Sequence, residues 1–146
     1  MRPGYPDGHG WVMHLELVSL VVTDYDAAID FFVDSLHFEL VENSPAPTND
    51  GRPKRWVVVR PPGATTGILL AQADGDEQRA VVGRQHAGRV GFFLRVDDFD
   101  AEYERLRSVG VAFVTDPRDE QYGRVAVFED VVGNRWDLLG PTAQGG

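Results

Sequence analysis

The chain contains no cysteine, which excludes disulfide bonds, thiolate metal ligands and a cysteine nucleophile. A bound metal would have to use His, Asp, Glu or water as ligands. The sequence has no apolar run approaching the roughly 20 residues that a membrane span requires. Its first residues also lack the basic and then apolar order of a signal peptide. We therefore expect a cytoplasmic protein with no membrane partner.

Basic residues are scarce relative to acidic ones. The chain has 14 Lys and Arg against 23 Asp and Glu, which gives a formal net charge of −9. Such a field repels phosphate backbones, so nucleic acid is not an expected partner. No Ser or Thr lies in a nucleophile-elbow motif, and no Walker-type glycine loop is present. The 146 residues, 42% of them hydrophobic, are enough for the core of one domain.

The sequence repeats itself once. The run from Leu20 to Ala28 (LVVTDYDAA) returns as Leu94 to Glu102 (LRVDDFDAE), so that Asp24 corresponds to Asp98 at an offset of 98 − 24 = 74 residues. In each copy the apolar run before the acidic residue predicts a strand. The two predicted strands are Glu16 to Thr23 and Val90 to Val96.

A helix is predicted after each of these strands. Asp24 and Asp98 occupy the N-cap position, where a carboxylate accepts first-turn N–H groups and contributes about 1 kcal/mol relative to Ala. Gly110 ends the second helix, whereas His37 takes that place in the first, which predicts a strained C-terminal cap. A short strand and then a strand pair follow each helix. They are Phe38 to Val41 with Trp56 to Arg60 and Gly67 to Ala71, and Val111 to Val114 with Arg124 to Glu129 and Asn134 to Leu139.

Each unit is thus a βαβββ module, and the predicted fold class is α+β. We expect the two modules to pair into a curved, barrel-like mixed sheet around a central cup. The polar, proline-containing segment from Asn43 to Lys54 is predicted to be a long loop. The expected organisation is a single domain, 1–146, with module one at about 15–72, a linker at about 73–88, module two at about 89–140, and flexible N- and C-terminal ends.

Three segments resemble a known family: the run from Leu20 to Phe32, its second copy around Phe99, and the run from Phe128 to Leu138. The last is similar to the pattern Phe-x-Asp-Pro-x-Gly-Asn-x-x-Glu-Leu, with Val131 in place of Pro and Asp137 in place of Glu. Over nearly its whole length the chain resembles the glyoxalase/bleomycin resistance protein/dioxygenase superfamily, whose fold is also called the vicinal oxygen chelate fold. The resemblance is greatest to uncharacterised bacterial members and implies no particular substrate.

Metal-using members of this superfamily place four ligands on the strands, typically a His on the first strand and a Glu on the last strand of each module. Only one of the four positions carried over by resemblance has a side chain that binds metal, and one carboxylate does not hold a divalent ion against water. Because the residues at these positions do not match the ligands of the family, we expect no metal and no cofactor. The four positions are Leu17 and Gly91 on the first strands, and Asp137 with either Ile68 or Leu69 on the last strands.

Asp137 is the best candidate for a catalytic residue. Strand alternation places it on the face opposite Trp136, and the resemblance implies that this face is the cup. Its carboxylate would hydrogen-bond an Arg or Tyr of the fold, anchor a ligand amine, or act as an acid or base. A rearranged metal site remains an alternative, and it would combine Asp137 and Glu129 with His14 or His86.

Ligand-binding candidates follow from position in the modules rather than from a catalytic motif. For each of them a structural role is the alternative, with Trp56 in the core and the arginines paired on a solvated rim. The candidates are Trp56, Arg60, Gln85, Arg89, Tyr122 and Asp137.

Two functions compete. The first is a protein that binds a small, largely apolar molecule in its cup without a metal, as the antibiotic-binding members of the superfamily do. An aromatic cavity in an acidic protein suits a cationic aromatic molecule. The second is a metal-dependent lyase, isomerase or dioxygenase acting on a small oxygenated substrate. Whether the protein is an enzyme stays open, and the family also leads us to expect a homodimer.

Overall fold

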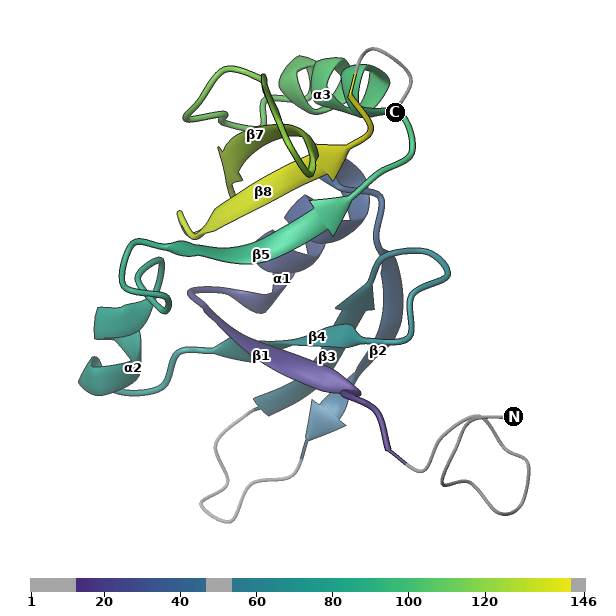
Figure 1. Ribbon diagram of the computed structural model, residues 1–146. Coiled ribbons are helices and arrows are strands. Elements are labelled where there is room, and N and C mark those ends of the chain that lie inside the picture. The colour runs from purple at the N-terminus through teal and green to yellow at the C-terminus, as the bar shows by residue number, and fades with distance from the viewer. Residues whose placement is uncertain (1–12, 47–53, 143–146) are drawn as a thin grey trace.

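The computed structural model describes residues 13–46 and 54–142, which form two four-stranded mixed sheets (Figure 1). In each sheet the first strand of a module is parallel to its fourth, and the other neighbours are antiparallel. The orders β1-β4-β3-β2 and β5-β8-β7-β6 confirm the α+β class and the paired modules, but the sheets are not closed into a barrel. The strands are β1 Leu17–Val22, β2 Glu39–Ala46, β3 Lys54–Arg60, β4 Gly67–Gln72, β5 Val90–Arg95, β6 Arg118–Glu120, β7 Gly123–Glu129 and β8 Arg135–Gly140.

The helices occupy the expected places, with one addition. The first, α1 (Tyr25–Ile29), continues as a π-helical segment, η1 (Asp30–Ser35), and α3 (Phe99–Ser108) is its counterpart in module two. The additional helix, α2 (Asp76–Val81), lies in the linker, for which the sequence analysis assigned no helix. Within 13–46 and 54–142, no helix combines the length and apolar character needed to cross a membrane.

Two sequence predictions are wrong in part. The first four residues of the predicted loop, Asn43 to Ala46, are instead the end of β2, because they pair antiparallel with β3. Val111 to Val114 is not a regular strand, since only Phe113 forms a bridge there, to Phe128 of β7. The sixth strand lies instead at Arg118–Glu120, after the predicted strand from Val111 to Val114. The predicted flexible ends and residues 47–53 of the predicted loop lie outside the described residues.

Both predicted helix caps are present. The Asp24 carboxylate accepts a hydrogen bond from the Ala27 backbone N–H at 2.8 Å, and the Asp98 carboxylate accepts one from Ala101 at 3.2 Å. His37 has a left-handed backbone with φ of 63°, which confirms the strained position expected after the first helix. The repeated acidic residue of the sequence is therefore a helix cap in both modules.

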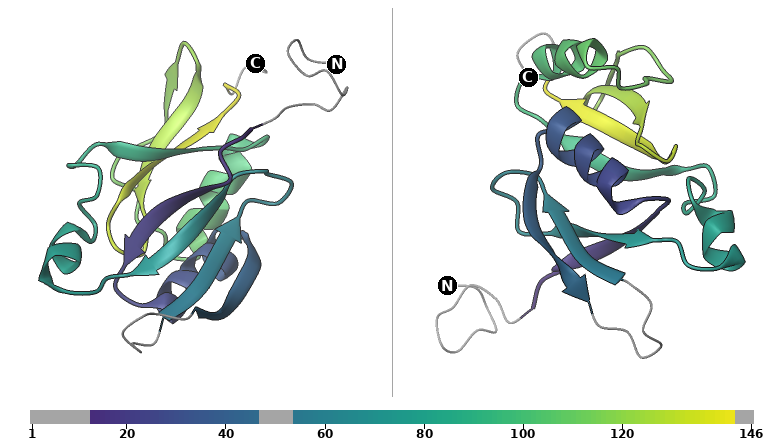
Figure 2. Two further views of the ribbon diagram at one scale, coloured as in Figure 1. Left: turned by 90° about the horizontal axis from the view of Figure 1, so that it is seen from below. Right: turned by 180° about the vertical axis from the view of Figure 1, so that it is seen from behind.

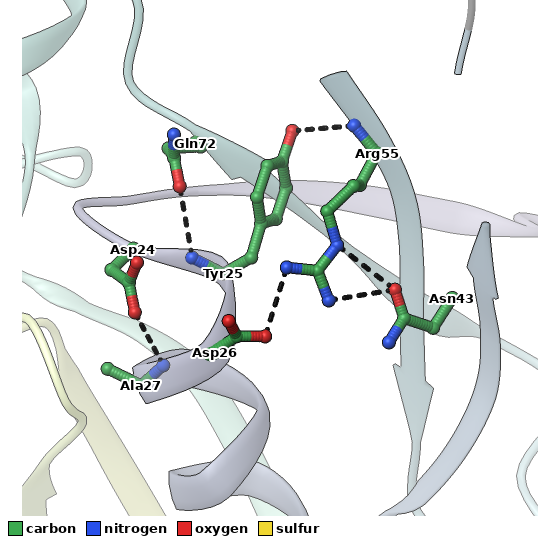
Figure 3. A network of polar contacts seen from close by, with 7 residues as sticks. All are labelled: Asp24, Tyr25, Asp26, Ala27, Asn43, Arg55 and Gln72. Atoms are coloured by element: carbon green, nitrogen blue, oxygen red, sulfur yellow. Dashed lines mark hydrogen bonds and ion pairs between the residues drawn. The ribbon is translucent and has the colours of Figure 1, made fainter. Parts of the chain in front are cut away.

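An arginine on the third strand of module one fastens α1 to its sheet (Figure 3). The Arg55 guanidinium donates to Asp26 Oδ1 at 3.0 Å and to Asn43 Oδ1 at 2.9 and 3.1 Å, and it lies 5.0 Å from the centre of the Tyr25 ring. The Arg55 backbone N–H also donates to the Tyr25 hydroxyl at 3.3 Å. One side chain thus joins the first turn of α1 to β2 and β3.

Module two contains the same clamp in equivalent positions. Arg124 on β7 donates to Asp100 at 3.1 Å and to Asp119 at 3.0 Å, and its guanidinium lies 5.6 Å from the centre of the Phe99 ring. The repeated sequence Asp-aromatic-Asp therefore has the same structural role in both copies. Its first Asp caps the helix, the aromatic ring receives the guanidinium, and the second Asp binds that guanidinium.

The two modules share one core, with Trp136 at their junction. Its indole stacks on Phe92 with ring centres 4.4 Å apart and lies 5.7 Å from Phe32, which extends from η1 of the other module. Figure 1 and the right-hand view of Figure 2 show the first helix lying between the two sheets. Because the helix-covered face of each sheet turns into this common core, the opposite face of each sheet points outward.

A buried carboxylate holds Trp136 in place. Asp130, 6% exposed, accepts the indole N–H of Trp136 through Oδ2 at 3.0 Å. Its Oδ1 accepts the backbone N–H groups of Val132 and Asn134, each at 3.0 Å. The Asp of the family-like motif therefore shapes the turn between β7 and β8 and orients the ring at the module junction.

We expect Arg55→Met to lower the free energy of unfolding by about 1 kcal/mol, because methionine keeps an apolar stem but loses the exposed ion pair and the ring contact. Urea denaturation measures this loss, and Arg124→Met should behave in the same way. The control is Arg84→Met, at an exposed arginine with no ion pair among the described residues, where the change should stay within about 0.5 kcal/mol. Equal effects at Arg55 and Arg84 would contradict the clamp.

Candidate functional site

The outward side of the first sheet, here called the module-one face, carries an open pocket of about 520 Å³. Trp56, Val58 and Arg60 line it from β3, as alternation on the strand requires, and Leu17 and Val41 contribute from β1 and β2. Trp56 remains 40% exposed, so its ring is available on the pocket wall rather than packed in the core. Aliphatic and aromatic surface therefore dominates the centre of this face.

Arg60 is the cationic group of the module-one face. Its Nη2 lies 3.7 Å from Glu39 Oε2, a long ion pair, and its buried Nε has no hydrogen-bond partner in the described structure. Glu16 and Glu42 line the same pocket. The pocket therefore combines an apolar centre with charges of both signs.

The outward side of the second sheet, here called the module-two face, consists of Phe93, Arg118, Val127 and Asp137. Asp137 lies on β8 between Phe93 of β5 and Val127 of β7, which are its cross-strand partners. It is 6% exposed, and its Oδ1 has no hydrogen-bond partner among the described residues. Phe93 beside it is 65% exposed. The face therefore places a buried, incompletely satisfied carboxyl next to an exposed aromatic ring.

Burial raises the pKa of the Asp137 carboxyl, because the charged form loses water, while the nearby Arg118 guanidinium acts in the opposite direction and lowers it. Arg118 is itself held by Glu120, with Nε and Oε1 2.7 Å apart. Its pKa is raised mainly by this hydrogen bond and also by Tyr122. Asp137, Arg118, Glu120 and Tyr122 thus form one cluster of interacting polar side chains in the second module.

Strand register identifies the position in module one that corresponds to Asp137. Asp137 pairs with Phe93 and Val127, and Leu69 pairs with the equivalent residues Ser19 and Val58. The counterpart is therefore Leu69 rather than Ile68, whose side chain belongs to the buried core. A leucine at this position offers no metal ligand.

Gly91, the last of the four ligand positions, is blocked by a neighbouring ring. The pairing of β5 with β8 is irregular between Val90 and Phe92, so Gly91 lies in a bulge. A Cβ on Gly91 would lie 2.3 Å from Nδ1 of His86, which rests edge-on against Phe92 with ring centres 5.1 Å apart. His86 therefore fills the space that a larger side chain at residue 91 would need.

The donor set does not fit the divalent metal of the superfamily. Leu17, Leu69 and Gly91 supply no ligand, and Asp137 stands alone. Among residues 13–46 and 54–142, no three His, Asp or Glu side chains lie close enough together to hold a metal ion. The alternative metal sites that combine His14 or His86 with Asp137 and Glu129 are therefore not formed by these residues within one chain.

The predicted ligand-binding residues fall into four places. Trp56 and Arg60 line the pocket of the module-one face, whereas Asp137 and the 56% exposed Tyr122 lie in module two. Gln85 accepts from the Val21 N–H at 2.9 Å and donates to the Ser19 carbonyl at 2.8 Å, so both ends of its amide cover the free edge of β1. Arg89 lines a small separate pocket at the linker, described below.

Phe93 is the site residue that sequence reasoning missed, and His86, considered there only as a metal ligand, packs against Phe92 instead. Strand alternation puts the adjacent Phe92 and Phe93 on opposite faces, but the apolar run from Val90 to Val96 does not show which of the two faces the core. In the structure Phe92 follows the bulge at Gly91 and lies against the core, and Phe93 lies outside. The only available signal was the glycine itself, which often marks a bulge within a strand.

These features agree with comparisons to known proteins. Residues 11–138 match the model of the Glyoxalase/Bleomycin resistance protein/Dioxygenase superfamily. The chain belongs to this superfamily. It is 50% identical over 123 residues to an uncharacterised protein of Shewanella frigidimarina (strain NCIMB 400), covering 84% of this chain and 89% of that protein.

Solved structures give the same result. TnmS3, an antibiotic binding protein from Streptomyces sp. CB03234, is similar with a TM-score of 0.69 and 33% identity, over 92% of this chain and 100% of that one. UcmS2 is similar with a TM-score of 0.75 and 29% identity, over 88% of this chain and 98% of that one. The fold assigned from the sequence repeat is therefore shared with an antibiotic binding protein.

The raised pKa of Asp137 predicts a pH-dependent effect of Asp137→Asn. A folded-state pKa above the unfolded value favours folding at pH values below the unfolded pKa of about 3.9, and this contribution is lost as the pH rises through the folded pKa. At pH 7 the permanently neutral asparagine should therefore raise the urea midpoint relative to the parent protein. The difference should shrink towards pH 3.

The control for this experiment is Asp34→Asn, at an exposed aspartate of η1. Its midpoint should differ little from that of the parent protein at either pH. If Asp137→Asn lowers the midpoint at pH 7, Asp137 stabilises the fold as a charged group, and the stated effect of burial is wrong.

Proposed function

We propose that this protein binds a small, largely apolar molecule on its module-one face, without a metal ion. The observation that carries the proposal is the pocket of about 520 Å³ with the half-exposed Trp56 on its wall. A ring held by a strand gives a flat stacking surface at low entropic cost, and the surrounding aliphatic side chains favour an apolar ligand. The similarity to TnmS3 supports this class of function.

The charges of the pocket favour an aromatic ligand that also carries polar groups. The enclosed Nε of Arg60 lacks an acceptor, and a carbonyl or hydroxyl of the ligand would supply one. The carboxylates of Glu16 and Glu42 are suited to an amine at the rim. A cationic aromatic molecule, such as an amine-bearing antibiotic, meets all these demands and is also attracted by the net charge of −9.

The second part of the proposal is that two chains form a homodimer that covers the outward faces. Each face presents a large exposed ring, Trp56 on one and Phe93 on the other, and Val41 of β2, which is 44% exposed, lines the same pocket as Trp56. Contiguous apolar surface of this kind marks an interaction site. A module-two face of one copy lying over the module-one face of another would enclose the open pocket and bring a buried carboxyl to it.

The direct test of ligand binding is a thermal-shift screen with cationic aromatic antibiotics. We expect at least one to stabilise the protein, and Trp56→Ala to weaken its binding by about tenfold or more, because one stacked ring contributes on the order of 1 kcal/mol beyond its buried area. The control is Val109→Ala, at an exposed residue just after α3, which should bind like the parent protein.

Two outcomes would contradict this proposal. If no compound of the screen stabilises the protein, or if Trp56→Ala binds as tightly as the parent, the module-one pocket is not the ligand site. Metal analysis tests the metal-free part separately. A stoichiometric divalent ion in the purified protein, together with a lower melting temperature in EDTA, would overturn it.

The homodimer is tested by sedimentation equilibrium. We expect the parent protein to sediment as a dimer and Phe93→Glu to shift it towards the monomer, because a charge on the covered face must be desolvated. Val109→Glu is the matched control at an exposed valine outside both faces and should remain dimeric. A parent protein that is monomeric, or a Phe93→Glu variant that stays fully dimeric, would disprove this arrangement.

A further inference from the structure

A second, smaller pocket of about 200 Å³ lies where the linker between the modules meets the turn between β7 and β8. Figure 1 shows the linker loop that precedes β5 beside the start of β8. None of the residues lining this pocket belongs to the module-one or module-two face as defined above. Its polar lining consists of His86 and Arg89 from the linker, and of Glu129, Asn134 and Arg135 from the turn and its flanking strands.

Two buried nitrogen atoms in this lining lack partners. Asn134 is 3% exposed, and its side-chain Nδ2 has no hydrogen-bond partner in the described structure. The buried Nδ1 of His86 is also unpaired. A buried donor without an acceptor costs on the order of 1–3 kcal/mol, so native proteins satisfy nearly all such groups with a protein atom, an ordered water or a ligand. The amide of Asn134 is therefore available to an acceptor bound in the pocket.

The two arginines of the pocket belong to the minority of described arginines that form no ion pair, together with Arg84 and Arg95. Most described arginines form an ion pair with a carboxylate: Arg55, Arg60, Arg79, Arg105, Arg107, Arg118 and Arg124. Arg89 and Arg135 form none within the described residues, although the protein carries an excess of acidic groups. Glu129 is the one carboxylate in the lining, so two guanidinium groups outnumber it.

The backbone holds these groups in fixed positions. A Cβ on Gly83 would lie 2.2 Å from the Val132 carbonyl oxygen, so the linker is pressed directly against the turn. Ala87, between His86 and Gly88, has a left-handed backbone with φ of 56°. The Asp130 carboxylate fixes the Asn134 backbone through a 3.0 Å hydrogen bond. The donors are thus arranged in advance, as binding sites for small charged groups require.

We propose that this pocket binds a small oxyanion, a carboxylate or phosphate group, which accepts hydrogen bonds from Asn134 and is neutralised by Arg89 and Arg135. Guanidinium groups suit both anions because they offer paired N–H donors. The site goes beyond the proposed function, since it uses other residues and an opposite ligand charge. A bound anion would contact both the linker and the turn between β7 and β8, and it would so stabilise the junction of the modules.

The experiment titrates the full chain with inorganic phosphate and, separately, with acetate, at constant ionic strength set with chloride. The side-chain amide resonances of Asn134 in ¹H–¹⁵N spectra report on the site, and thermal stability is followed in parallel. We expect saturable shifts of these resonances with at least one anion and a melting temperature that rises with its concentration. The titration that saturates, with phosphate or with acetate, shows which of the two anionic groups the pocket binds.

Variants locate the effect. Arg89→Gln and Arg135→Gln should each weaken anion binding by about tenfold, the effect of losing one charge-assisted hydrogen bond. Asn134→Asp, which places a negative charge in the pocket, should abolish it. The matched control is Arg84→Gln, at an unpaired linker arginine that does not line the pocket and should bind within about twofold of the parent.

Three results would overturn the proposal: no saturation with either anion, an equal response to chloride, or equal weakening in the Arg84→Gln variant. In the first case the unpaired donors bind water only. If Asn134→Asp does not fold, the two arginine variants still decide the question. Because Trp56→Ala should leave anion binding unchanged, failure of this site and failure of the module-one pocket are distinguishable.

Discussion

The packing of Trp136 between the modules is the contact on which the rest of the molecule depends. Its ring lies between Phe92 of its own sheet and Phe32 of the first helix segment, and its N–H is held by the buried Asp130. This contact turns the helix-covered face of each sheet towards the other. The opposite faces, with Trp56 and Phe93, are consequently left outside, where they are free to meet a ligand or a second chain.

The superfamily fold is retained here without the arrangement that binds its metal. Strand register makes Leu69 the module-one counterpart of Asp137, and at the Gly91 bulge the His86 ring fills the space that a larger side chain would need. The difference from the superfamily's pattern of metal ligands therefore involves the backbone as well as the side chains at these positions. On the module-two face, Asp137 is a buried carboxyl whose pKa is raised by burial and lowered by the nearby Arg118.

Charge is distributed unevenly over this acidic protein. On the helix sides, arginines are used structurally, as Arg55 and Arg124 show by holding helix, strand and aromatic ring together in both modules (Figure 3). Arg89 in the linker and Arg135 at the start of β8 have no such carboxylate partner within the described part of the chain. Their guanidinium groups therefore differ from those of the two clamps, which are each bound to an aspartate.

By resemblance to the superfamily the sequence located three of the four ligand positions, but only the strand register chose Leu69 over Ile68 for the fourth. The sequence by itself determined the two modules and their helix caps. Each follows from local chemistry: strand alternation, a carboxylate before a helix, and a repeat of fixed offset. It also placed Trp56 and Arg60 on one strand face. Only the tertiary structure decided that Gln85 covers the edge of β1, that β2 extends through Ala46, and that the sixth strand lies at Arg118–Glu120. These features depend on pairing between segments that are distant in the chain, and no local pattern encodes them. The packing at Trp136, which leaves one face of each sheet exposed, depends on distant segments for the same reason.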